Sequence, residues 1–389
     1  MLELINESVS KELENTIGFR RYIHSHPCLS YHEEQTRDYI CSRLESAGID
    51  YRLCGKNGIV AKLIGEDDSR CIAFRADFDA LPIQEPEGLE YRSVNPGVMH
   101  ACGHDFHAAS LLSLARILKQ HPQWLKCSAQ FIFQYAEELP PGGAKPMIED
   151  GCLEGVSKIY GLHVSEEIPT GSVGVRCGKY MAASDAFFID FTGEGGHGSR
   201  PSEAMDTVSA AATAITQINA VISRFVSPLN DAVISVCKIH GGETYNIIPE
   251  CVKLEGTVRT YEAETAESIF GKIREIAEHS AHIYGANAQV RVEYGYPALV
   301  NSQKETETVA AVSQQLGIPI QEIPPTPVGE DFARYLQLIP GAFFRIGIRN
   351  EELGAVYPLH NKKFRLDESA LETALKLCLG IYLKETKQL

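Results

Sequence analysis

Apolar residues recur at helical spacing twice near the start of the chain. The first run covers residues 8–27 and stops at Pro27, and the second covers residues 33–48 and stops at Gly48. Proline cannot continue a helix, and glycine is a common residue just after a helix end. The pattern therefore predicts two helices joined by a short loop.

The next apolar runs have the character of strands, and acidic residues follow them. Residues 58–65 and 71–79 are β-rich, and the second run ends in Asp77 and Asp79. Two residues apart on a strand, these carboxylates point to the same side. We interpret them as supporting a site at the edge of a sheet, with a strand-end cap or turn as the alternative.

A third apolar run, residues 128–134, leads to Glu137 and Glu138 in a Pro/Gly turn that cannot continue the sheet. The segment 147–164 predicts a helix, a glycine break and a short strand that ends near His163. A strand followed by a polar group thus occurs three times. This repetition suggests that the carboxyl ends of neighbouring strands converge.

The pattern changes near residue 182. Residues 183–297 read as β-α-β-β-α-β, which is the ferredoxin-like arrangement, a self-contained two-layer unit. Residues 300–389 return to α/β character and place His360 in a loop before a final helix. We therefore predict an α/β protein in which residues 1–182 and 298–389 form one domain and residues 183–297 an inserted α+β domain.

Composition narrows the class of protein. A chain of 389 residues suggests two domains, and 44% hydrophobic with 22% charged residues is ordinary for a soluble globular protein. The net charge of −15 argues against nucleic-acid or anionic-membrane partners. No apolar run is long enough to span a membrane, no secretory signal is visible, and the 11 cysteines are widely spaced. We expect a cytoplasmic protein with reduced thiols.

The segment MHACGHDFH, residues 99–107, concentrates the candidate chemistry. Thiolate and imidazole are ligands that zinc prefers, and Cys102 and His104 are close enough to share a site. His100 and His107 are interpreted as support, and Asp105 as a carboxylate at the start of the following helix that supports the site. A structural zinc site or a reactive thiol remains the alternative for these residues taken alone.

More candidate ligands lie at other strand ends and loops. Together with Cys102 and His104 they form a mixed set that exceeds one tetrahedral ion and suits a two-metal site. One glutamate of the adjacent pair would be a ligand, and the other would hold a water and act as general base. The further members of the set are Glu138 (or Glu137), His163 and His360.

Motifs along nearly the whole chain resemble the aminoacylase/carboxypeptidase family of binuclear metallohydrolases. The resemblance is to its amidohydrolase branch, which includes auxin-conjugate hydrolases, hippurate hydrolases and N-acetyldiaminopimelate deacetylases. The motifs are RRYIHSHPCLS, RADFDALPIQE, MHACGHDFH, AEELPPGGAKPMIEDG, GLHV, GGHGSRP, YNIIPE, GTVRT, GEDF and YPLHNKKF. In this family we expect a zinc-peptidase-like catalytic domain with a central mixed sheet flanked by helices, and a lid domain.

The resemblance implies a role for each candidate residue. It implies two divalent metal ions per subunit, zinc or manganese first, with cobalt or nickel as alternatives. The ligands would be Cys102, His104, Glu138, His163 and His360, with Glu137 as catalytic base. On the lid, His197 would stabilise the oxyanion, and Asn246 and Arg259 would bind the substrate carboxylate. The resemblance also implies a homodimer formed through the lid.

The expected activity is hydrolysis of small-molecule N-acyl amino acids to a carboxylic acid and an amino acid. A dipeptidase or carboxypeptidase of the same family, or a metal-binding protein without turnover, is the alternative. A thiol redox protein built on Cys102 would need a resolving cysteine nearby, and no CxxC is present. One departure from the family pattern is the turn LPPGGAK, where a run of glycines is expected; this puts the acyl preference in doubt.

Overall fold

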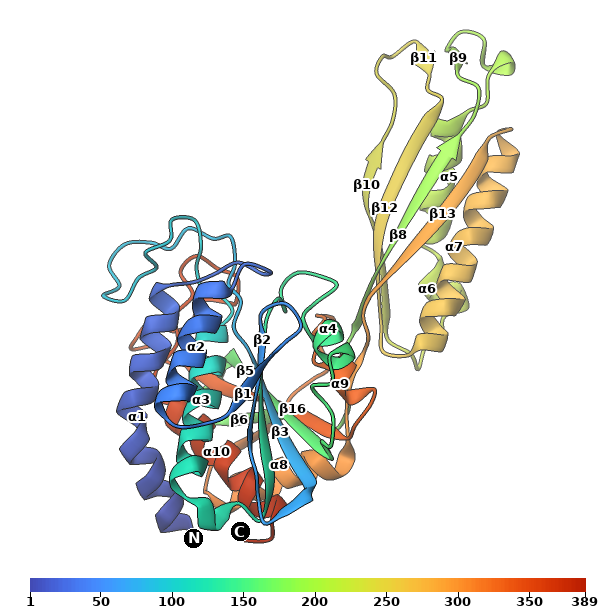
Figure 1. The fold of residues 1–389 in the computed structure, drawn as a ribbon. Coiled ribbons are helices and arrows are strands. Elements are labelled where there is room, and N and C mark those ends of the chain that lie inside the picture. The colour runs from blue at the N-terminus through green and yellow to red at the C-terminus, as the bar shows by residue number, and fades with distance from the viewer. The chain divides into compact units, whose positions relative to one another are not determined.

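The computed structural model describes residues 1–389, and the chain divides into two units (Figure 1). Unit 1 comprises Met1–Gly178, Val300–Pro324 and Asp331–Leu389. Unit 2 comprises Lys179–Leu299 and Pro325–Glu330. The second unit thus includes Pro325–Glu330, which the boundaries predicted from the sequence leave in the first domain.

Unit 1 is built around one mixed sheet with the strand order β1-β2-β4-β3-β5-β16-β6-β15. The four central strands of this order are parallel to one another, and antiparallel pairs occur at β1/β2, β2/β4 and β16/β6. The strands are β1 (Tyr51–Cys54), β2 (Gly58–Leu63), β3 (Asp67–Asp77), β4 (Cys127–Gln134), β5 (Lys158–Pro169), β6 (Val173–Val175), β15 (Ile320–Glu322) and β16 (Gly341–Arg349).

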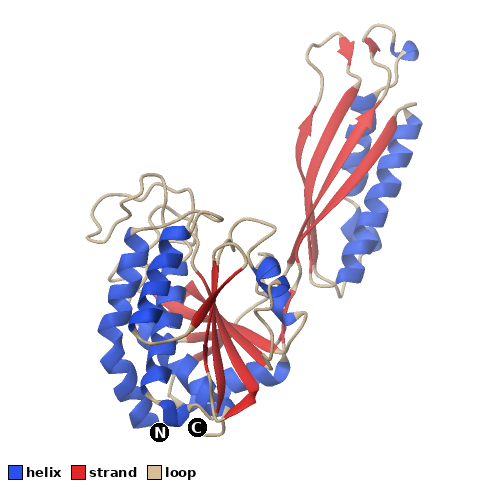
Figure 2. Ribbon diagram, viewed as in Figure 1, coloured by secondary structure: helices blue, strands red, loops and turns tan.

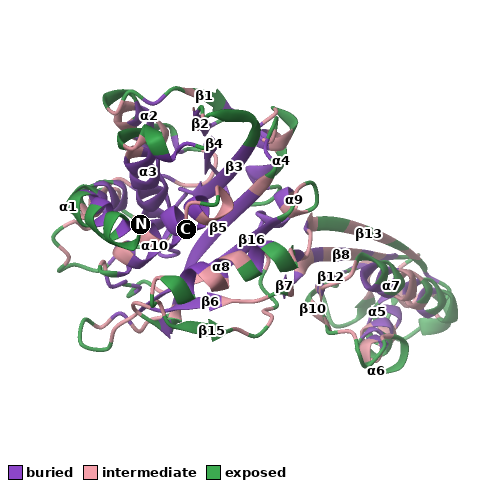
Figure 3. Cartoon of the chain, turned by 90° about the horizontal axis from the view of Figure 1, so that it is seen from below, coloured by how far each residue is buried: buried purple, intermediate pink, exposed green.

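Helices cover this sheet on both faces (Figure 2). Helices α1, α2, α3 and α10 lie on one side, and the short helices α4 and α9 on the other (Figures 1 and 3). The bounds are α1 (Leu2–Ser25), α2 (Glu34–Ser46), α3 (His104–Gln120), the 3-10 turn Pro122–Trp124, α4 (Ala144–Glu149), α8 (Gln303–Gln315), α9 (Ala333–Leu336) and α10 (Ala370–Glu385).

Burial on both faces explains why the central strands read as apolar runs. Every residue of β4 is buried, and β5 and β16 are largely buried as well (Figure 3). Strands β4, β3, β5 and β16 run parallel, so their carboxyl ends lie at one edge of the sheet. The segments after Asp77 and Gln134 therefore emerge side by side, which is the convergence predicted from the sequence.

Unit 2 has the ferredoxin-like topology that the sequence predicts. Its antiparallel sheet has the order β10-β12-β8-β13, and two long helices follow the first and third of these strands along the chain. Its elements are β8 (Ala183–Thr192), β9 (Gly196–His197), the 3-10 turn Pro201–Glu203, α5 (Thr207–Ile218), α6 (Val221–Phe225), β10 (Ala232–His240), β11 (Ile247–Ile248), β12 (Cys251–Thr260), α7 (Ala263–Ile283) and β13 (Asn287–Tyr296). Strands β7 (Gly178–Met181) and β14 (Leu299–Asn301) lie at the boundaries of the unit.

The core of unit 2 lies between its sheet and its helices. Phe187, Ile189 and Leu254 from the strands are fully buried against Phe270 and Ile273 of α7. Asp206 directly precedes α5, and its carboxylate accepts a hydrogen bond from the Ser209 N–H at 2.9 Å. This is the usual N-cap arrangement, which satisfies a donor that the helix itself cannot.

Several element boundaries differ from the prediction: α1 already begins at Leu2, and β3 runs from Asp67 to Asp77. Strand β5 runs past His163 to Pro169, because β16 pairs with it from Ile159 to Pro169. The alanine-rich run at 206–225 forms two helices, α5 and α6, separated at Asn219 and Ala220. No helix in the structure is both long and apolar enough to cross a membrane.

Gly256 in β12 tests the packing of unit 2. A Cβ added there would collide with the Phe187 ring and the Ser235 carbonyl oxygen, so Gly256→Ala should destabilise the fold by about 1–3 kcal/mol. Gly271→Ala in α7 is the matched control, because no atom lies within 4 Å of the added Cβ and alanine favours a helix. Calorimetry should show a lower melting temperature for Gly256→Ala and an unchanged or higher one for Gly271→Ala. Equal melting temperatures of the two variants would contradict this packing.

Candidate metal centre

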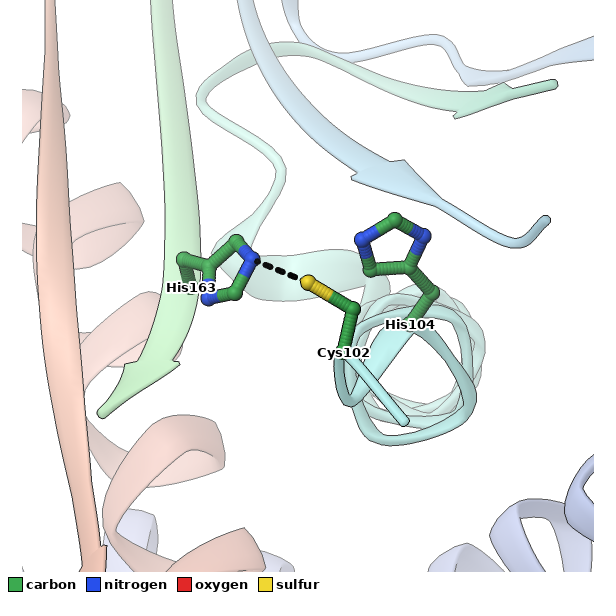
Figure 4. A group of neighbouring side chains, drawn as sticks. All are labelled: Cys102, His104 and His163. Carbon is green, nitrogen blue, oxygen red and sulfur yellow. Dashed lines mark hydrogen bonds between the residues drawn. The ribbon is translucent and has the colours of Figure 1, made fainter. Parts of the chain in front are cut away.

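Cys102, His104 and His163 form a buried cluster in unit 1 (Figure 4). One potential ligand atom from each lies within 4.8 Å of the other two. The Cys102 Sγ is 3.4 Å from His163 Nε2. Cys102 and His104 flank the start of α3, and His163 comes from β5, so a loop, a helix end and a strand meet here.

Gly103 allows Cys102 and His104, on either side of it, to reach the same cluster. It has a φ of +88°, and a Cβ at this position would collide with the Val164 side chain. Only glycine adopts such a backbone without strain and fits against Val164. The sequence Cys-Gly-His is therefore a local requirement of the turn into α3.

Neighbouring groups fix which ring nitrogen of each histidine is available. His163 Nδ1 lies 2.8 Å from the Val164 carbonyl oxygen, which can only accept, so Nδ1 carries the proton and Nε2 faces Cys102. His104 Nδ1 donates to Asp79 Oδ1 at 3.1 Å, and its Nε2 is buried without a hydrogen-bond partner. Both histidines thus present a ring nitrogen to the cluster, as metal-ligating histidines do.

Glu138 and His360 form a second group with Cys102. Their ligand atoms also lie within 4.8 Å of one another, and Glu138 Oε1 is 3.2 Å from His360 Nε2. His360 has a φ of +63°, and its N–H donates to the Ala101 carbonyl oxygen at 2.8 Å. This hydrogen bond ties the loop before α10 to the residue that precedes Cys102.

Glu137 lies beside these groups. It is buried, and one of its oxygens lies within 4.8 Å of ligand atoms of His104 and Glu138. The two adjacent glutamates therefore reach the same small volume. Glu138 is the member of the pair that also groups with Cys102 and His360, so Glu137 is the candidate for proton transfer.

The electrostatics of the cluster match a site for a cation. Burial, together with the charges of Glu138 and Glu137, raises the pKa of the Cys102 thiol well above its usual range. Burial also lowers the pKa of His163 well below its usual range. Burial disfavours charge on His104 too, but Asp77 and Asp79 outweigh it and raise its pKa to about 10. A metal ion would supply the positive charge that ionises the thiol.

These residues fit a divalent metal. The buried His104 Nε2 has no hydrogen-bond partner within the protein, and such a polar atom is costly unless a ligand satisfies it. A thiol, three imidazoles and a carboxylate are suitable donors for zinc and for other divalent transition metals. The side chains predicted as ligands are thus brought together; their roles as ligands stay a prediction.

Asp79 and Asp77 support the cluster from two sides. Asp79 Oδ2 accepts the Glu138 backbone N–H at 3.0 Å, while its other oxygen accepts from His104. Asp77 Oδ1 accepts from His107 Nδ1 at 2.6 Å, and His107 Nε2 in turn accepts the Val164 N–H at 3.1 Å. His107 therefore links Asp77 to the residue beside His163. Asp79 thus bonds two proposed ligands directly, whereas Asp77 is connected to the neighbour of a proposed ligand through His107. The supporting role that the sequence suggests for both aspartates stays a prediction.

Asp105 is predicted from the sequence to support the ligands, and its contacts lie elsewhere. It is in the first turn of α3, as predicted, but its carboxylate pairs with Arg20 Nε at 2.7 Å and His24 Nδ1 at 2.9 Å. Asp105 points towards α1 because it is one residue further around the helix than His104. It therefore fixes α3 to α1. His24 is buried in this contact, in keeping with a packing role.

The loop that carries the two glutamates is held by residues that sequence reasoning missed. Glu33 is buried and its Oε1 accepts the backbone N–H of Ala136 at 2.9 Å, while its Oε2 accepts from Asn57. Ala136 precedes Glu137 and has a φ of +50°, which is unusual for a residue with a side chain. Asp331 accepts the Ala144 N–H at 3.0 Å at the far end of the loop.

These missed residues act together. With Asp79 at Glu138, three buried carboxylates accept backbone N–H groups along one loop. Asp331 is itself held by Arg75 and by Gln134 at the end of β4. Glu33 and Glu34 are adjacent in the chain, and the sequence gives no sign of which of the two side chains is buried. The motif GEDF was the one available signal for Asp331.

In unit 2 the predicted substrate-binding residues fall into two places. His197 pairs with Ile247 between β9 and β11, and the Asn246 carbonyl oxygen accepts the Gly198 N–H at 2.8 Å. Arg259 lies at the carboxyl end of β12, far from the end that follows β11. It is half-buried there, and its guanidinium donates a hydrogen bond to the Val258 carbonyl oxygen at 3.0 Å. From Cys251 to Arg259 the strand spans about 26 Å. One copy of unit 2 therefore does not bring Asn246 and Arg259 together as the predicted carboxylate clamp.

Comparison with known proteins relates this geometry to a family. The sequence profile of peptidase family M20/M25/M40 matches residues 73–384. An N-acetyl-L-cysteine deacetylase of Bacillus subtilis is 38% identical over 91% of this chain and 84% of its own length. A thermostable carboxypeptidase of Saccharolobus solfataricus is 38% identical over 93% of each chain.

A solved structure gives the same relationship. The crystal structure of a dinuclear metal-binding peptidase of the M20 family from Bacillus subtilis matches with a TM-score of 0.86 and 34% identity. The match covers 98% of this chain and 100% of that one. The similarity in sequence and in fold thus extends along more than nine-tenths of the chain.

Cys102→Ala should lose at least one metal equivalent per chain. The reason is that the Cys102 Sγ belongs to two groups of potential ligands, one that includes His163 and one that includes His360. Cys41→Ala, at another buried thiol, is the matched control and should retain the wild-type metal content. Elemental analysis of the purified proteins measures the effect. Unchanged stoichiometry in Cys102→Ala would contradict the assignment of this cluster.

Glu33→Ala should lower kcat by about 10- to 100-fold, because the Ala136 N–H loses its acceptor and the backbone beside Glu137 can shift. Metal content should be kept, since Glu33 contacts no proposed ligand. Glu34→Ala, at the exposed neighbouring position, is the control. Steady-state kinetics with elemental analysis decides: an unchanged kcat, or a loss of metal that accounts for the loss of activity, would contradict this role.

Proposed function

The chain belongs to peptidase family M20/M25/M40, and from that membership we propose that it is a metal-dependent amidohydrolase of N-acyl amino acids. It is a hydrolase of this family; the amide substrate and the roles of individual residues are the proposal. The observation that carries it is the meeting of two ligand groups at Cys102 with the adjacent pair Glu137 and Glu138. A site for metal storage alone has no need of the second glutamate.

Two divalent ions held by Cys102, His104, Glu138, His163 and His360 would polarise the substrate carbonyl and lower the pKa of a water. We propose zinc or manganese, with cobalt or nickel as alternatives, because mixed nitrogen, oxygen and sulfur donors accept all four. Glu137 then takes the proton from the attacking water and passes it to the amide nitrogen, so that the amino acid leaves as a neutral amine.

Burial of Glu137 suits this task. A carboxylate shielded from bulk water keeps the proton that it has accepted from exchanging before the proton reaches the leaving nitrogen. The loop clamped by Glu33, Asp79 and Asp331 holds the carboxylate in place during both transfers.

We propose that unit 2 supplies the groups for the rest of the substrate. His197 would donate to the oxyanion, and Asn246 and Arg259 would bind the carboxylate of the amino-acid moiety. Because Asn246 and Arg259 lie at opposite ends of one unit 2, a homodimer through this unit could combine them from two copies. The homodimer is therefore part of the proposal.

A carboxypeptidase activity is the second candidate, and the 38% identical carboxypeptidase from Saccharolobus solfataricus favours it. Its chemistry is the same, and the substrates differ only in the group on the acyl side. The similarity to the N-acetyl-L-cysteine deacetylase favours the first candidate. A metal-binding protein without turnover is the alternative outside the hydrolases.

One panel of substrates tests the proposal. We expect the metal-loaded protein to release free amino acid from at least one of the acetyl-, benzoyl- and indoleacetyl-amino acids, and to act less well on dipeptides with a free amino group. Glu137→Gln should abolish turnover, with a loss of at least about 10²-fold, while metal content is kept. Amino-acid release is followed by chromatography and metal by elemental analysis.

The wild type and two variants separate the outcomes. Glu138→Gln serves as the comparison, because it should lose metal as well as activity. Normal turnover by Glu137→Gln would overturn the assignment of the base. Dipeptides preferred over every N-acyl amino acid would favour the peptidase alternative, and a metal-loaded wild type without activity on any amide would favour the protein without turnover.

A further inference from the structure

A cavity of about 350 Å³ lies in unit 1 between two loops. One loop follows β3 and contributes Pro86 and Met99, and the other precedes α10 and contributes Leu353 and Phe364. In Figure 1 they are the blue-green loop after β3 and the red loop before α10. The volume falls within the range of small-molecule pockets, and these four side chains give it apolar walls.

Three cations line the same cavity, namely Lys362, Lys363 and Arg365. All three are exposed, and none forms an ion pair or a hydrogen bond through its side chain within the protein. Lys363 Nζ lies 5.3 Å from the centre of the Tyr357 ring, which also lines the cavity. In a chain with a net charge of −15, three unpaired cations around one hollow are a local reversal of the overall charge.

The two acidic residues that follow this basic segment, Asp367 and Glu368, are paired with other groups. No Asp or Glu occurs between Glu352 and Asp367. Asp367 is bonded to Asn350 and Ser369, and Glu368 pairs with Arg20 and Arg21. The carboxylates of Asp367 and Glu368 are therefore engaged by groups other than the three cations.

Glu85 is the one acidic residue that lines the cavity, and both of its oxygens are in use. Oε1 is 3.0 Å from His24 Nε2, and Oε2 accepts the Ser93 N–H at 2.7 Å. Glu85 is buried in these contacts, so it leaves the cations available for an anion from solution.

We propose that this cavity binds a small organic carboxylate with an aromatic or branched aliphatic body. The apolar walls would cover the body, and the three cations would pair with the carboxylate at the rim. A purely inorganic anion would leave the apolar walls uncovered, and a neutral molecule would leave the cations without a partner. The site is separate from the five proposed metal ligands and goes beyond the proposed hydrolysis.

The position of the cavity connects it with the metal centre. Met99 precedes Cys102 in the same loop, and Lys362 follows His360. The Ala101 carbonyl oxygen and the His360 N–H join these two loops by a hydrogen bond of 2.8 Å. A carboxylate in the cavity therefore contacts both segments that deliver Cys102 and His360.

Photo-crosslinking with 4-benzoylbenzoate tests the site in the metal-loaded protein. This probe has a two-ring apolar body, one carboxylate and a photoreactive ketone. We expect adducts, mapped by mass spectrometry of peptides, on the segments 85–99 and 353–365. The neutral 4-benzoylbenzamide should label them far less. Benzoate in excess should compete with the probe, and inorganic phosphate should compete poorly. Labelling does not require turnover, so its outcome is independent of the proposed function.

Two sets of variants make the test specific. The triple variant Lys362→Gln/Lys363→Gln/Arg365→Gln should bind the probe about tenfold more weakly. The variant Lys119→Gln/Lys304→Gln/Arg70→Gln removes the same charge at exposed positions away from the cavity and should bind as the wild type does. Leu353→Glu should weaken labelling more than Leu353→Gln, because both place an exposed polar side chain there and only one adds an anion to the wall.

The proposal is overturned by any of the following results. These are the absence of adducts on both segments in the wild type, equal labelling by the neutral amide, and equal weakening by the two triple variants. Competition by phosphate as strong as that by benzoate would also overturn it, because the apolar walls would then play no part. Melting temperatures of all variants, measured alongside, identify any loss of labelling that follows from unfolding.

Discussion

The carboxylate of Asp79 holds two of the proposed metal ligands at once. One oxygen accepts from His104 Nδ1, which leaves Nε2 of that ring available, and the other accepts the backbone N–H of Glu138. A buried carboxylate is stable only when hydrogen bonds or charges satisfy it, and here the ligand loop provides them. The ligands and the group that orients them are therefore mutually dependent.

The same principle extends outwards through the sheet. Asp77 orients His107, which holds the backbone next to His163, and Arg75 bridges Asp77 to Asp331. Asp331 and Glu33 in turn accept backbone N–H groups at the two ends of the loop that carries Glu137 and Glu138. The parallel strands β4, β3, β5 and β16 make this network possible, because they place the starting points of all these segments at one edge.

Backbone constraints occur where the network is tightest. Gly103 and Ala136 both have positive φ, and each stands directly before a proposed functional residue. Glycine reaches this conformation easily, whereas Ala136 is held in it by Glu33 and by the Gly143 N–H on its carbonyl oxygen. The loop beside the proposed base is thus positioned by contacts from distant parts of the chain.

Much of the architecture followed from periodicity. The two N-terminal helices, the buried central strands and the ferredoxin-like unit each have a repeat of hydrophobic positions that local structure obeys. The ends of elements were harder to predict from the sequence. Strand β5 is an example, because its extension past His163 depends on pairing with β16, which lies far along the chain. The contacts of Asp105 could not be predicted for a related reason, because its partners Arg20 and His24 lie on another helix.

The sequence by itself determined the family, the α/β class and the set of thiol, imidazole and carboxylate groups, because motifs and periodicity are local properties of the chain. Tertiary structure alone decided which carboxylates hold the site, that Asn246 and Arg259 stand far apart within unit 2, and that the cations after His360 surround a cavity. Burial and hydrogen-bond partners depend on residues up to hundreds of positions away, and no local pattern specifies them.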